Sequence, residues 1–451
     1  MKVVVIGATH AGVAAVKTLL KFRPDAEVTV FERNADISFI GAGVPLYLEN
    51  QIPDLNQLLN AKVSDLTALG AKMLMQHDVI RIDFKRQEVL AQNLVDHQQV
   101  TASYDKLILT TGSAVVIPAM QGIDARRVMV VKDHPTTEHA VKAVRTAKRI
   151  VIVGGGYVGA EMAEALSKDH AVTLLQRGEQ LLDLYYDTPI AKLVHKLFDD
   201  HGVDVHLNEG VTGFDNDKEL MVRTPKASYP ADLALVCTGF IPVTNLVEGH
   251  VDLDRRGAVV TNAFGQSSDP NIYAAGDVRS SYCNALGGPS YLPLASNAVR
   301  QGELVGLNVA GRHFRDRGSQ GSTALNLYGQ AFTSTGLTQN RAEFFGLNPQ
   351  SYTYVDWQRP TFMQTNSRVS VHLVFDKVTH RLLGGQLQSK EADVAQATDA
   401  LSVAIQNRNT LEDLAFVDML FHPQYNQPLN YLNAAAQQAI GKHPTIDRVD
   451  K

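Results

Sequence analysis

Cysteine is almost absent from this sequence. The chain of 451 residues holds two, Cys237 and Cys283, and they form no Cys-x-x-Cys pair. Two thiols so far apart exclude a disulfide framework and favour a reducing cytoplasm as the location. We expect both to be structural, Cys237 in a buried strand and Cys283 in a loop. The scarcity of thiols argues against a disulfide reductase.

Positive charge and long apolar runs are also scarce. Lys and Arg number 42 against 47 Asp and Glu, and the net charge of −5 argues against a nucleic-acid or anionic-membrane partner. No apolar run is long enough to span a bilayer. Because the first strand begins at Lys2, we expect no signal peptide. The His residues show no metal-ligand spacing such as His-Glu-x-x-His, so we predict no metal site.

What the sequence does contain is a strand, turn, helix and strand at its very start. The apolar residues 3–6 predict a buried parallel strand that Gly7 ends. Residues 11–22 then predict a helix and residues 26–31 a second strand, closed by Glu32. A helix N-terminus for a pyrophosphate and a carboxylate for a ribose hydroxyl make up a dinucleotide-binding unit. Because Thr9 replaces the middle glycine of the usual pattern, this stretch alone also fits an ordinary βαβ unit.

A second copy of the unit strengthens the nucleotide interpretation. Residues 149–153 predict another buried strand, the following GGGYVGAE keeps the glycine spacing at Gly154, Gly156 and Gly159, and residues 171–175 predict the next strand. A third signal, NIYAAGD, ends in Asp277, which can reach a ribityl or ribose hydroxyl. Two nucleotide units and a late A-x-G-D motif describe an enzyme with FAD at the first unit and a nicotinamide nucleotide at the second.

The predicted fold class is α/β, with two Rossmann-like nucleotide-binding domains and a C-terminal α+β dimerisation domain. Such a length suits two or three domains. We expect an FAD domain in two parts, residues 1–119 and 243–321, around an inserted NAD(P) domain, residues 120–242. The C-terminal domain is residues 322–451. Its predicted strands are residues 324–328, 332–337, 351–355 and 369–375, and its predicted helices are residues 393–406 and 410–417.

Three further segments are predicted to border the nucleotides. The strand of residues 104–113 runs into Thr111 and Gly112, and the strand of residues 231–239 ends in Gly239. A helix near residues 294–310 starts with Pro293, and its N-terminus would favour an anionic reduced flavin, although it also fits a plain packing helix. The tail FHPQYNQPLNYLN has aromatic, His and Pro residues suited to covering a neighbouring active site.

Five motifs carry a resemblance to a known family. They are VIGATHAG, ISFIGAG, VGGGYVGAE, AAGD and LPLASNAVRQG. With them the whole chain resembles the NADH oxidase, NADH peroxidase and coenzyme A-disulfide reductase group of FAD-dependent pyridine nucleotide-disulfide oxidoreductases. It looks closest to the lactic-acid-bacterial NADH oxidases, in which the GATHAG form is expected. The resemblance implies FAD as cofactor, NADH or NADPH as substrate, O2 as acceptor and a homodimer.

The resemblance breaks at Ala42. The family normally places one redox-active Cys there, just before a predicted helix at residues 43–48, where a helix N-terminus would depress a thiol pKa. Its thiolate–sulfenate cycle reduces peroxide to water, which alanine cannot do. Four interpretations stay open: a natural oxidase that stops at hydrogen peroxide, a Cys-to-Ala variant of a water-forming oxidase, a flavoprotein with another acceptor, and a non-catalytic redox sensor. Gly41 also replaces the usual Ser of this loop, which favours Ala42 as a natural replacement.

The resemblance also implies roles for individual side chains. Hydride passes from the nicotinamide to flavin N5, and O2 then takes two electrons. The Tyr157 ring covers the flavin until NAD(P)H displaces it. His10 lies near residue 42 and either donates a hydrogen bond to an oxygen species or packs beside the flavin. Glu161 either lies beside the flavin or is a carboxylate near a helix N-terminus, where the helix dipole stabilises it. For Arg300 and His422 two alternatives stay open, a role in the active site or a position on the surface without one.

The end of the second unit indicates nucleotide preference. NAD-specific units end their second strand in Asp or Glu, which repels a 2′-phosphate. This chain has Gln176 there, followed by Arg177, whose guanidinium can pair with a phosphate. We therefore expect NADPH to be accepted, the alternative being that Arg177 points to solvent and NADH is favoured.

The expected site residues fall into three sets. The catalytic positions are His10, Ala42 and Tyr157. The FAD-binding residues are Gly7, Thr9, His10, Ala11, Gly12, Glu32, Arg33, Thr111, Gly112, Asp277, Leu294 and Ala295. The NAD(P)-binding residues are Gly154, Gly156, Tyr157, Val158, Gly159, Glu161, Gln176, Arg177 and Gly239.

Overall fold

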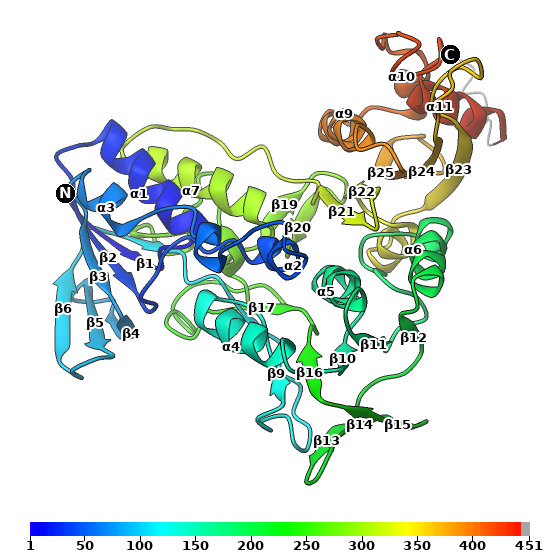
Figure 1. Ribbon diagram of the computed structural model, residues 1–451. Helices are drawn as coiled ribbons and strands as arrows, with labels where there is room; N and C mark the ends of the chain where they lie inside the picture. The colour runs from blue at the N-terminus through cyan, green and yellow to red at the C-terminus, as the bar shows by residue number, and fades with distance from the viewer. Residues whose placement is uncertain (443–451) are drawn as a thin grey trace.

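Two parallel sheets and one antiparallel sheet organise the chain (Figure 1). The computed structural model describes residues 1–442. The first sheet has the order β18-β7-β1-β2-β3, with all neighbours parallel. Its strands are β1 (Lys2–Ile6), β2 (Glu27–Glu32), β3 (Lys72–Met75), β7 (Lys106–Leu109) and β18 (Ile272–Ala274). The antiparallel strands β4 (His77–Asp83), β5 (Glu88–Asn93) and β6 (Gln99–Ser103) form a separate sheet beside it.

Two helices far apart in sequence pack together on the first sheet. Figure 1 shows α1 (His10–Phe22) beside α7 (Ala295–Val309). The contact needs glycine on α7, because a Cβ at Gly302 would overlap the carbonyl oxygen of Ala11 and one at Gly306 would lie 2.6 Å from that of Ala15. The short elements η1 (Gly41–Gly43), α2 (Val44–Leu48), η2 (Leu55–Leu58), α3 (Val63–Thr67) and η3 (Gly276–Val278) complete this part.

The second parallel sheet has the order β12-β11-β10-β16-β9. Its strands are β9 (Val128–Met129), β10 (Arg149–Val153), β11 (Ala171–Leu175), β12 (Asp204–His206) and β16 (Leu233–Val236). The helices with it are α4 (His134–Val144), α5 (Tyr157–Ser167) and α6 (Thr188–Asp200), and β13 (Gly213–Asn216), β14 (Leu220–Arg223) and β15 (Ser228–Ala231) form a small antiparallel sheet. The chain enters and leaves this part through β8 (Ser113–Val115) and β17 (Phe240–Pro242), which pair antiparallel.

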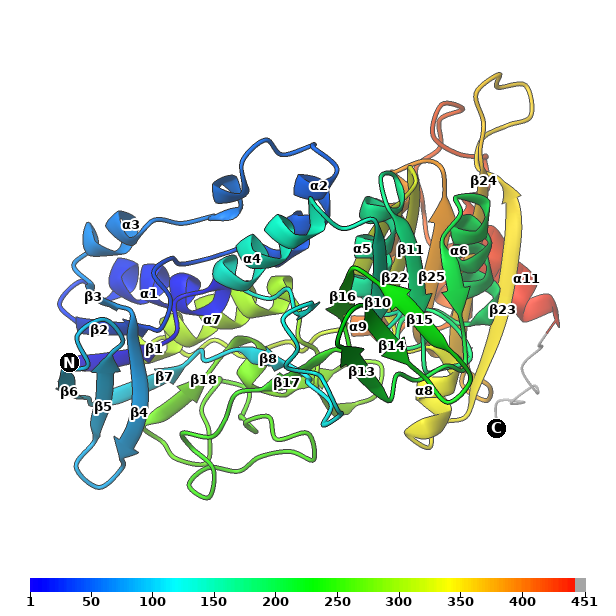
Figure 2. The ribbon, with the colours of Figure 1, turned by 60° about the horizontal axis from the view of Figure 1, so that its bottom comes forward.

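The C-terminal part is an antiparallel sheet with helices (Figure 2). The sheet has the order β21-β22-β25-β24-β23, from β21 (Thr323–Leu327), β22 (Gln330–Gly336), β23 (Pro349–Trp357), β24 (Arg368–Asp376) and β25 (Leu382–Ser389). The helices are α8 (Gln339–Phe344), α9 (Val394–Gln406), α10 (Leu411–Phe416) and α11 (Tyr431–Lys442), and the hairpin β19 (Ser281–Cys283) and β20 (Gly288–Ser290) lies earlier in the chain. The predicted fold class is confirmed.

Several local predictions need correction. Strand β25 was not predicted, because Gly384 and Gly385 in its middle are typical of a turn. The sheet requires a glycine there, since a Cβ at Gly384 would overlap the carbonyl oxygen of Leu337. Helix α11, which begins at Tyr431 within the FHPQYNQPLNYLN tail, was not predicted either. Pro293 precedes the N-cap of α7 instead of starting the helix.

Candidate active site

The first glycine turn brings two strands and a helix to within backbone contact. Gly7 has a φ of +98°, and a Cβ there would overlap the carbonyl oxygen of Thr110 on the neighbouring strand. A Cβ at Gly12, in the first turn of α1, would overlap the carbonyl oxygen of Gly7. Thr9 is the N-cap of α1, followed by His10 and Ala11 in its first turn. The helix N-terminus at the carboxyl end of β1 is the arrangement that binds a pyrophosphate.

Glu32 lies beside this turn with a buried carboxylate. Its Oε2 accepts a hydrogen bond of 2.6 Å from the Ala8 N–H, and its Oε1 accepts one of 2.8 Å from the Asn34 N–H. Burial raises the pKa of Glu32, while these hydrogen bonds oppose the rise. A carboxylate held at the end of β2 fits a ribose hydroxyl. Arg33 is exposed, with its Nε 3.9 Å from Asp78 Oδ1.

A polar cluster joins three parts of the chain near the first turn. Ser113 Oγ donates a 2.7 Å hydrogen bond to Asp277 Oδ2 and accepts one of 2.9 Å from Lys132 Nζ. The Lys132 ammonium lies 4.0 Å from the centre of the Phe240 ring, a cation–π contact. Burial lowers the pKa of Lys132, and Asp277 opposes that change. The motif had singled out Asp277 alone.

Neither Ser113 nor Lys132 was predicted from the sequence, although a weak signal existed for the lysine. Lys132 follows the apolar residues 128–131 and comes shortly after the partly buried strand β9, on the side of the sheet where α/β folds gather their ligand-binding side chains. His10 lies within electrostatic reach of the Lys132 ammonium and the Asp277 carboxylate. Burial and Lys132 lower the pKa of His10 while Asp277 raises it, and the net shift is downward. The imidazole is therefore neutral at pH 7.

Ala42 lies in the turn of η1, immediately before α2, and is exposed. The loop leading to Ala42 contacts helix α4, because His134 Nδ1 at the start of that helix lies 2.8 Å from Asp36 Oδ2. The Phe39 ring also lies 5.5 Å from the His134 ring. A Cβ at Gly41 would have one atom nearby, the Lys132 carbonyl oxygen at 3.7 Å. The position where the resemblance implies a thiol is thus exposed, and its neighbour Gly41 lies close to the Lys132 segment.

Neither cysteine lies in the turn that holds Ala42. Cys237 directly follows β16, and Cys283 ends strand β19 instead of lying in the predicted loop. Burial raises the pKa of Cys237 to about 12 and also raises the pKa of Cys283. Both thiols stay protonated and unreactive at neutral pH.

The second glycine turn repeats the first with more room at the helix. A Cβ at Gly159 would overlap the carbonyl oxygen of Gly154, which has a φ of +107°. At the N-cap of α5, a Cβ at Gly156 would have no atom within 4 Å. That open space at a helix N-terminus fits a dinucleotide pyrophosphate, with Val158 in the first turn of the helix. Gly239 likewise has open space and a φ of +95°.

The end of β11 carries no carboxylate. Gln176 turns inward, and its Oε1 accepts a 3.0 Å hydrogen bond from the Gly155 N–H in the glycine turn. Arg177 is exposed, and its aliphatic part lies against Gly210. The Gln176 amide brings no charge to the turn. The Arg177 guanidinium lies within electrostatic reach of the Asp183 carboxylate and opposes the rise in the pKa of Asp183 that burial causes.

Tyr157 and Glu161 occupy successive turns of α5. The Tyr157 hydroxyl lies 3.1 Å from that of Tyr186 and forms a hydrogen bond with Thr323 Oγ1. Glu161 is partly buried, and burial together with Glu164 raises its pKa to about 7. The glycine motif gave no sign that Tyr157 would be bonded to the C-terminal domain.

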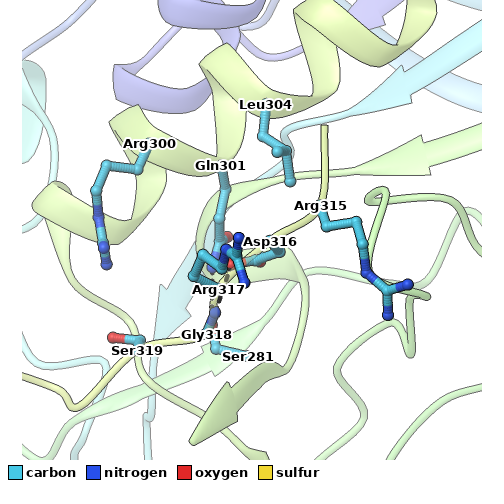
Figure 3. Close-up of a pocket in the computed structure, with 9 residues that line it drawn as sticks. All are labelled: Ser281, Arg300, Gln301, Leu304, Arg315, Asp316, Arg317, Gly318 and Ser319. Carbon is cyan, nitrogen blue, oxygen red and sulfur yellow. Dashed lines mark hydrogen bonds between the residues drawn. The ribbon is translucent and has the colours of Figure 1, made fainter. Parts of the chain in front are cut away.

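The remaining candidates lie elsewhere. Leu294 is the N-cap of α7 and Ala295 its first residue. Arg300 lines a cavity of about 180 Å³ whose lining includes none of the predicted nucleotide-binding residues. Figure 3 shows Arg300 on α7 at the edge of this cavity. Arg300 is exposed and donates a 2.5 Å hydrogen bond to Asn297 Oδ1. His422 packs locally, with its ring 5.7 Å from that of Tyr425.

Residues 1–442 show no sign of a metal centre or of a membrane-spanning helix. Across this range no three His, Cys, Asp or Glu side chains come together in a way that could hold a metal ion. Within the same range no helix has both the length and the apolar character needed to cross a membrane.

Comparison with known proteins identifies the family. Residues 1–302 match the pyridine nucleotide-disulphide oxidoreductase model, and residues 329–431 match the dimerisation domain of that family. An NADH oxidase of Enterococcus faecalis is 41% identical over 444 residues, which cover 98% of this chain and 99% of the relative. The structure of a water-forming NADH oxidase from Lactobacillus brevis, bound to NADH, is 44% identical with a TM-score of 0.96 and 98% of each chain covered.

A second solved structure is an engineered form of the Lactobacillus brevis enzyme. It is a water-forming NADPH oxidase bound to NADPH, also 44% identical with a TM-score of 0.96, and covers 98% of this chain and 99% of its own. Its five substitutions include an aspartate changed to alanine and the next residue, an alanine, changed to arginine. With its two nucleotide-binding turns and these relatives, the chain belongs to the pyridine nucleotide-disulphide oxidoreductase family, as an FAD-dependent NAD(P)H oxidase.

Proposed function

We propose that this protein oxidises NADPH and NADH and reduces O2 by two electrons, releasing hydrogen peroxide. The observation that carries the product assignment is the methyl group of Ala42, at the exposed turn where the family has its thiol. Cys237 and Cys283 lie in other structural elements and stay protonated. The chain therefore has no thiolate to take a second pair of electrons to peroxide.

The bound flavin supplies the hydride acceptor and the oxygen chemistry, and the side chains position the reactants. Asp277, which accepts a hydrogen bond from Ser113, can accept another from a hydroxyl of the FAD ribityl chain. Glu32 can accept a hydrogen bond from a ribose hydroxyl. Lys132 brings positive charge to the same place. The neutral imidazole of His10 can donate a hydrogen bond near residue 42. Tyr157 covers the flavin until the nicotinamide ring displaces it.

Acceptance of NADPH is supported by the end of β11. Gln176 has no charge to repel a 2′-phosphate, and the exposed guanidinium of Arg177, which also faces the Asp183 carboxylate, can pair with one. The engineered NADPH oxidase carries a comparable change, from an acidic residue to a neutral one followed by arginine. We propose that Arg177 binds the 2′-phosphate.

The oxygen stoichiometry tests the proposed product. Oxygen uptake is measured per NADPH and per NADH oxidised, and catalase is added after the nucleotide is spent. One O2 per nucleotide, with half returned by catalase, supports a two-electron oxidase. Half an O2 per nucleotide with none returned would mean that water forms without the thiol. Bleaching of the flavin by NADPH without oxygen uptake on exposure to air would indicate another acceptor.

We also propose that the protein is a homodimer. Phe362, Phe416 and Leu420 in the C-terminal part are 72%, 78% and 71% exposed. They lie on two adjoining segments, tied by a 3.0 Å hydrogen bond from Gln427 Nε2 to the Arg359 carbonyl oxygen (Figure 2). Exposed apolar side chains on neighbouring segments indicate a protein interface. Light scattering should give twice the chain mass, and a monomer at micromolar concentration would contradict the proposal.

A further inference from the structure

Four hydroxyl groups form a hydrogen-bonded series that ends in the C-terminal sheet. They belong to Tyr186, Tyr157, Thr323 and Ser334. The Tyr157 hydroxyl lies 3.1 Å from the Tyr186 hydroxyl on one side and bonds to Thr323 Oγ1 on the other. Thr323 pairs with Ser334 across strands β21 and β22, and their side-chain oxygens are 2.9 Å apart. Both partners of the Tyr157 hydroxyl thus come from outside its own helix, and one of them comes from the C-terminal domain.

The other end of the series is fixed as well. Tyr186 is fully buried, with its ring edge-on to Phe332 at 6.5 Å. The next residue, Asp187, receives a 2.7 Å hydrogen bond on Oδ2 from Gln386 Nε2, and its N–H donates one of 2.8 Å to Gln386 Oε1. The Gln339 N–H donates to the same carboxylate at 3.0 Å. These contacts fix Tyr186 in place, so it cannot follow Tyr157 when the Tyr157 ring moves.

The Tyr157 ring itself stands at the boundary between the NAD(P) part and the C-terminal domain. It is the first residue of α5, directly after the open turn at Gly156. Helix α5 packs against α2, the helix that follows Ala42, and also contacts β21 (Figure 1). The Tyr185 ring meets the Tyr157 ring edge-on at 4.2 Å. A nicotinamide ring that reaches the flavin from this turn has to move Tyr157 and break its contacts.

We propose that Thr323 and Ser334 are positioning residues that hold Tyr157 over the flavin, so that the C-terminal domain sets how readily the nicotinamide ring enters. This inference rests on the proposed displacement of Tyr157 by NAD(P)H. Displacement breaks the hydrogen bond to Thr323. Since one neutral hydrogen bond is worth about fivefold in an equilibrium constant, removing it strengthens nicotinamide binding by that factor.

Calorimetry with two unreactive ligands tests the proposal on the FAD-loaded protein. NADP⁺ carries a nicotinamide ring, whereas 2′-phospho-ADP-ribose lacks it and has no reason to move Tyr157. In Thr323→Val, which keeps the shape and removes the hydroxyl, we expect the Kd of NADP⁺ to fall about fivefold and the Kd of 2′-phospho-ADP-ribose to stay unchanged. Thr323→Ser should restore the wild-type values, and Ser334→Ala should give a smaller fall.

A matched control lies one residue away. Ser322 Oγ bonds to Thr335 Oγ1 at 2.8 Å, so Ser322→Ala breaks a similar hydroxyl pair that does not include Tyr157. It should change neither Kd. Equal Kd values in wild type and Thr323→Val, or a shift shared by both ligands, would overturn the positioning role. Because neither ligand is oxidised, this result is separate from the oxygen measurement, and an incorrect product assignment would leave it untouched.

Discussion

Lys132 Nζ lies 3.8 Å from Asp277 Oδ2, and Ser113 bridges the two with hydrogen bonds of 2.9 and 2.7 Å. The three residues come from segments that are separated by up to 164 positions. The lysine neutralises the carboxylate where the flavin chain is expected to bind, and at the same time places a cation near His10. The pair is therefore expected to set both cofactor affinity and the rate of flavin reduction.

Lys132→Met should weaken the flavin site. The substitution keeps the apolar length against Phe240 and removes a buried charged hydrogen bond, which is worth about 2 kcal/mol. We expect FAD affinity or the anaerobic rate of flavin bleaching to fall about tenfold or more. Stopped-flow absorbance and FAD titration measure the two effects. Ser113→Ala should show a smaller loss, and no effect in either variant would contradict the assigned cluster.

Arg177→Ala should separate the two nucleotides. A guanidinium–phosphate pair on the surface contributes about 1.5 kcal/mol, so the KM for NADPH should rise about tenfold while the KM for NADH stays within a factor of two. Steady-state kinetics with both substrates measures this. Gln176→Glu is the complementary variant, because it can still accept from the Gly155 N–H yet repels a 2′-phosphate. An equal change for both nucleotides in Arg177→Ala would remove the proposed contact.

Ala42→Cys should move the product from hydrogen peroxide toward water. The new thiol would stand in the turn before α2, and its thiolate can reduce peroxide to water and be regenerated by the flavin. Peroxide released per NADPH should fall from about one to below about one half, with overall turnover maintained. Ala42→Ser is the control without redox chemistry and should keep the peroxide yield. An unchanged yield in Ala42→Cys would mean that this turn does not face the site of oxygen reduction.

Glu161→Gln should alter the pH dependence of stability. Burial and Glu164 raise the pKa of Glu161 from 4.5 to about 7 in the native state. The native protein therefore binds a proton that the unfolded chain releases near pH 4.5, and it loses stability as the pH rises from 5 through 7. Thermal unfolding at pH 5, 6, 7 and 8 should show wild type falling relative to Glu161→Gln. Parallel curves for the two proteins would show that Glu161 titrates normally.

The sequence predicted best where one local pattern decides the structure. Strands Arg149–Val153 and Ala171–Leu175 match the structure to the residue, because each is a short apolar run bordered by polar or glycine positions. The glycine turns were found for the same reason. Strand β25 was missed because its two central glycines are required by distant neighbours. Gly384 faces the backbone of Leu337 and Gly385 faces the side chain of Leu401 on α9, and no local pattern expresses such contacts.

The missed parts of the site depend on contacts between distant residues. Tyr157 and Thr323 are 166 positions apart, and Glu164 bonds to the Tyr328 N–H across 164 positions. Serine and threonine hydroxyls occur throughout any chain, so only the fold shows which of them meet. The geometry of the glycine turns was therefore predictable, whereas their connection to the C-terminal domain was not.

The packing of α1 against α7 has a consequence for how the protein is made. The first sheet obtains its last strand, β18, and its covering helix, α7, about 270 residues after β1 leaves the ribosome. The intervening NAD(P) part contains all the strands of its own sheet and can fold first. Until α7 emerges, the apolar face of α1 is exposed on the nascent chain, so this helix is the segment that a chaperone would protect during synthesis.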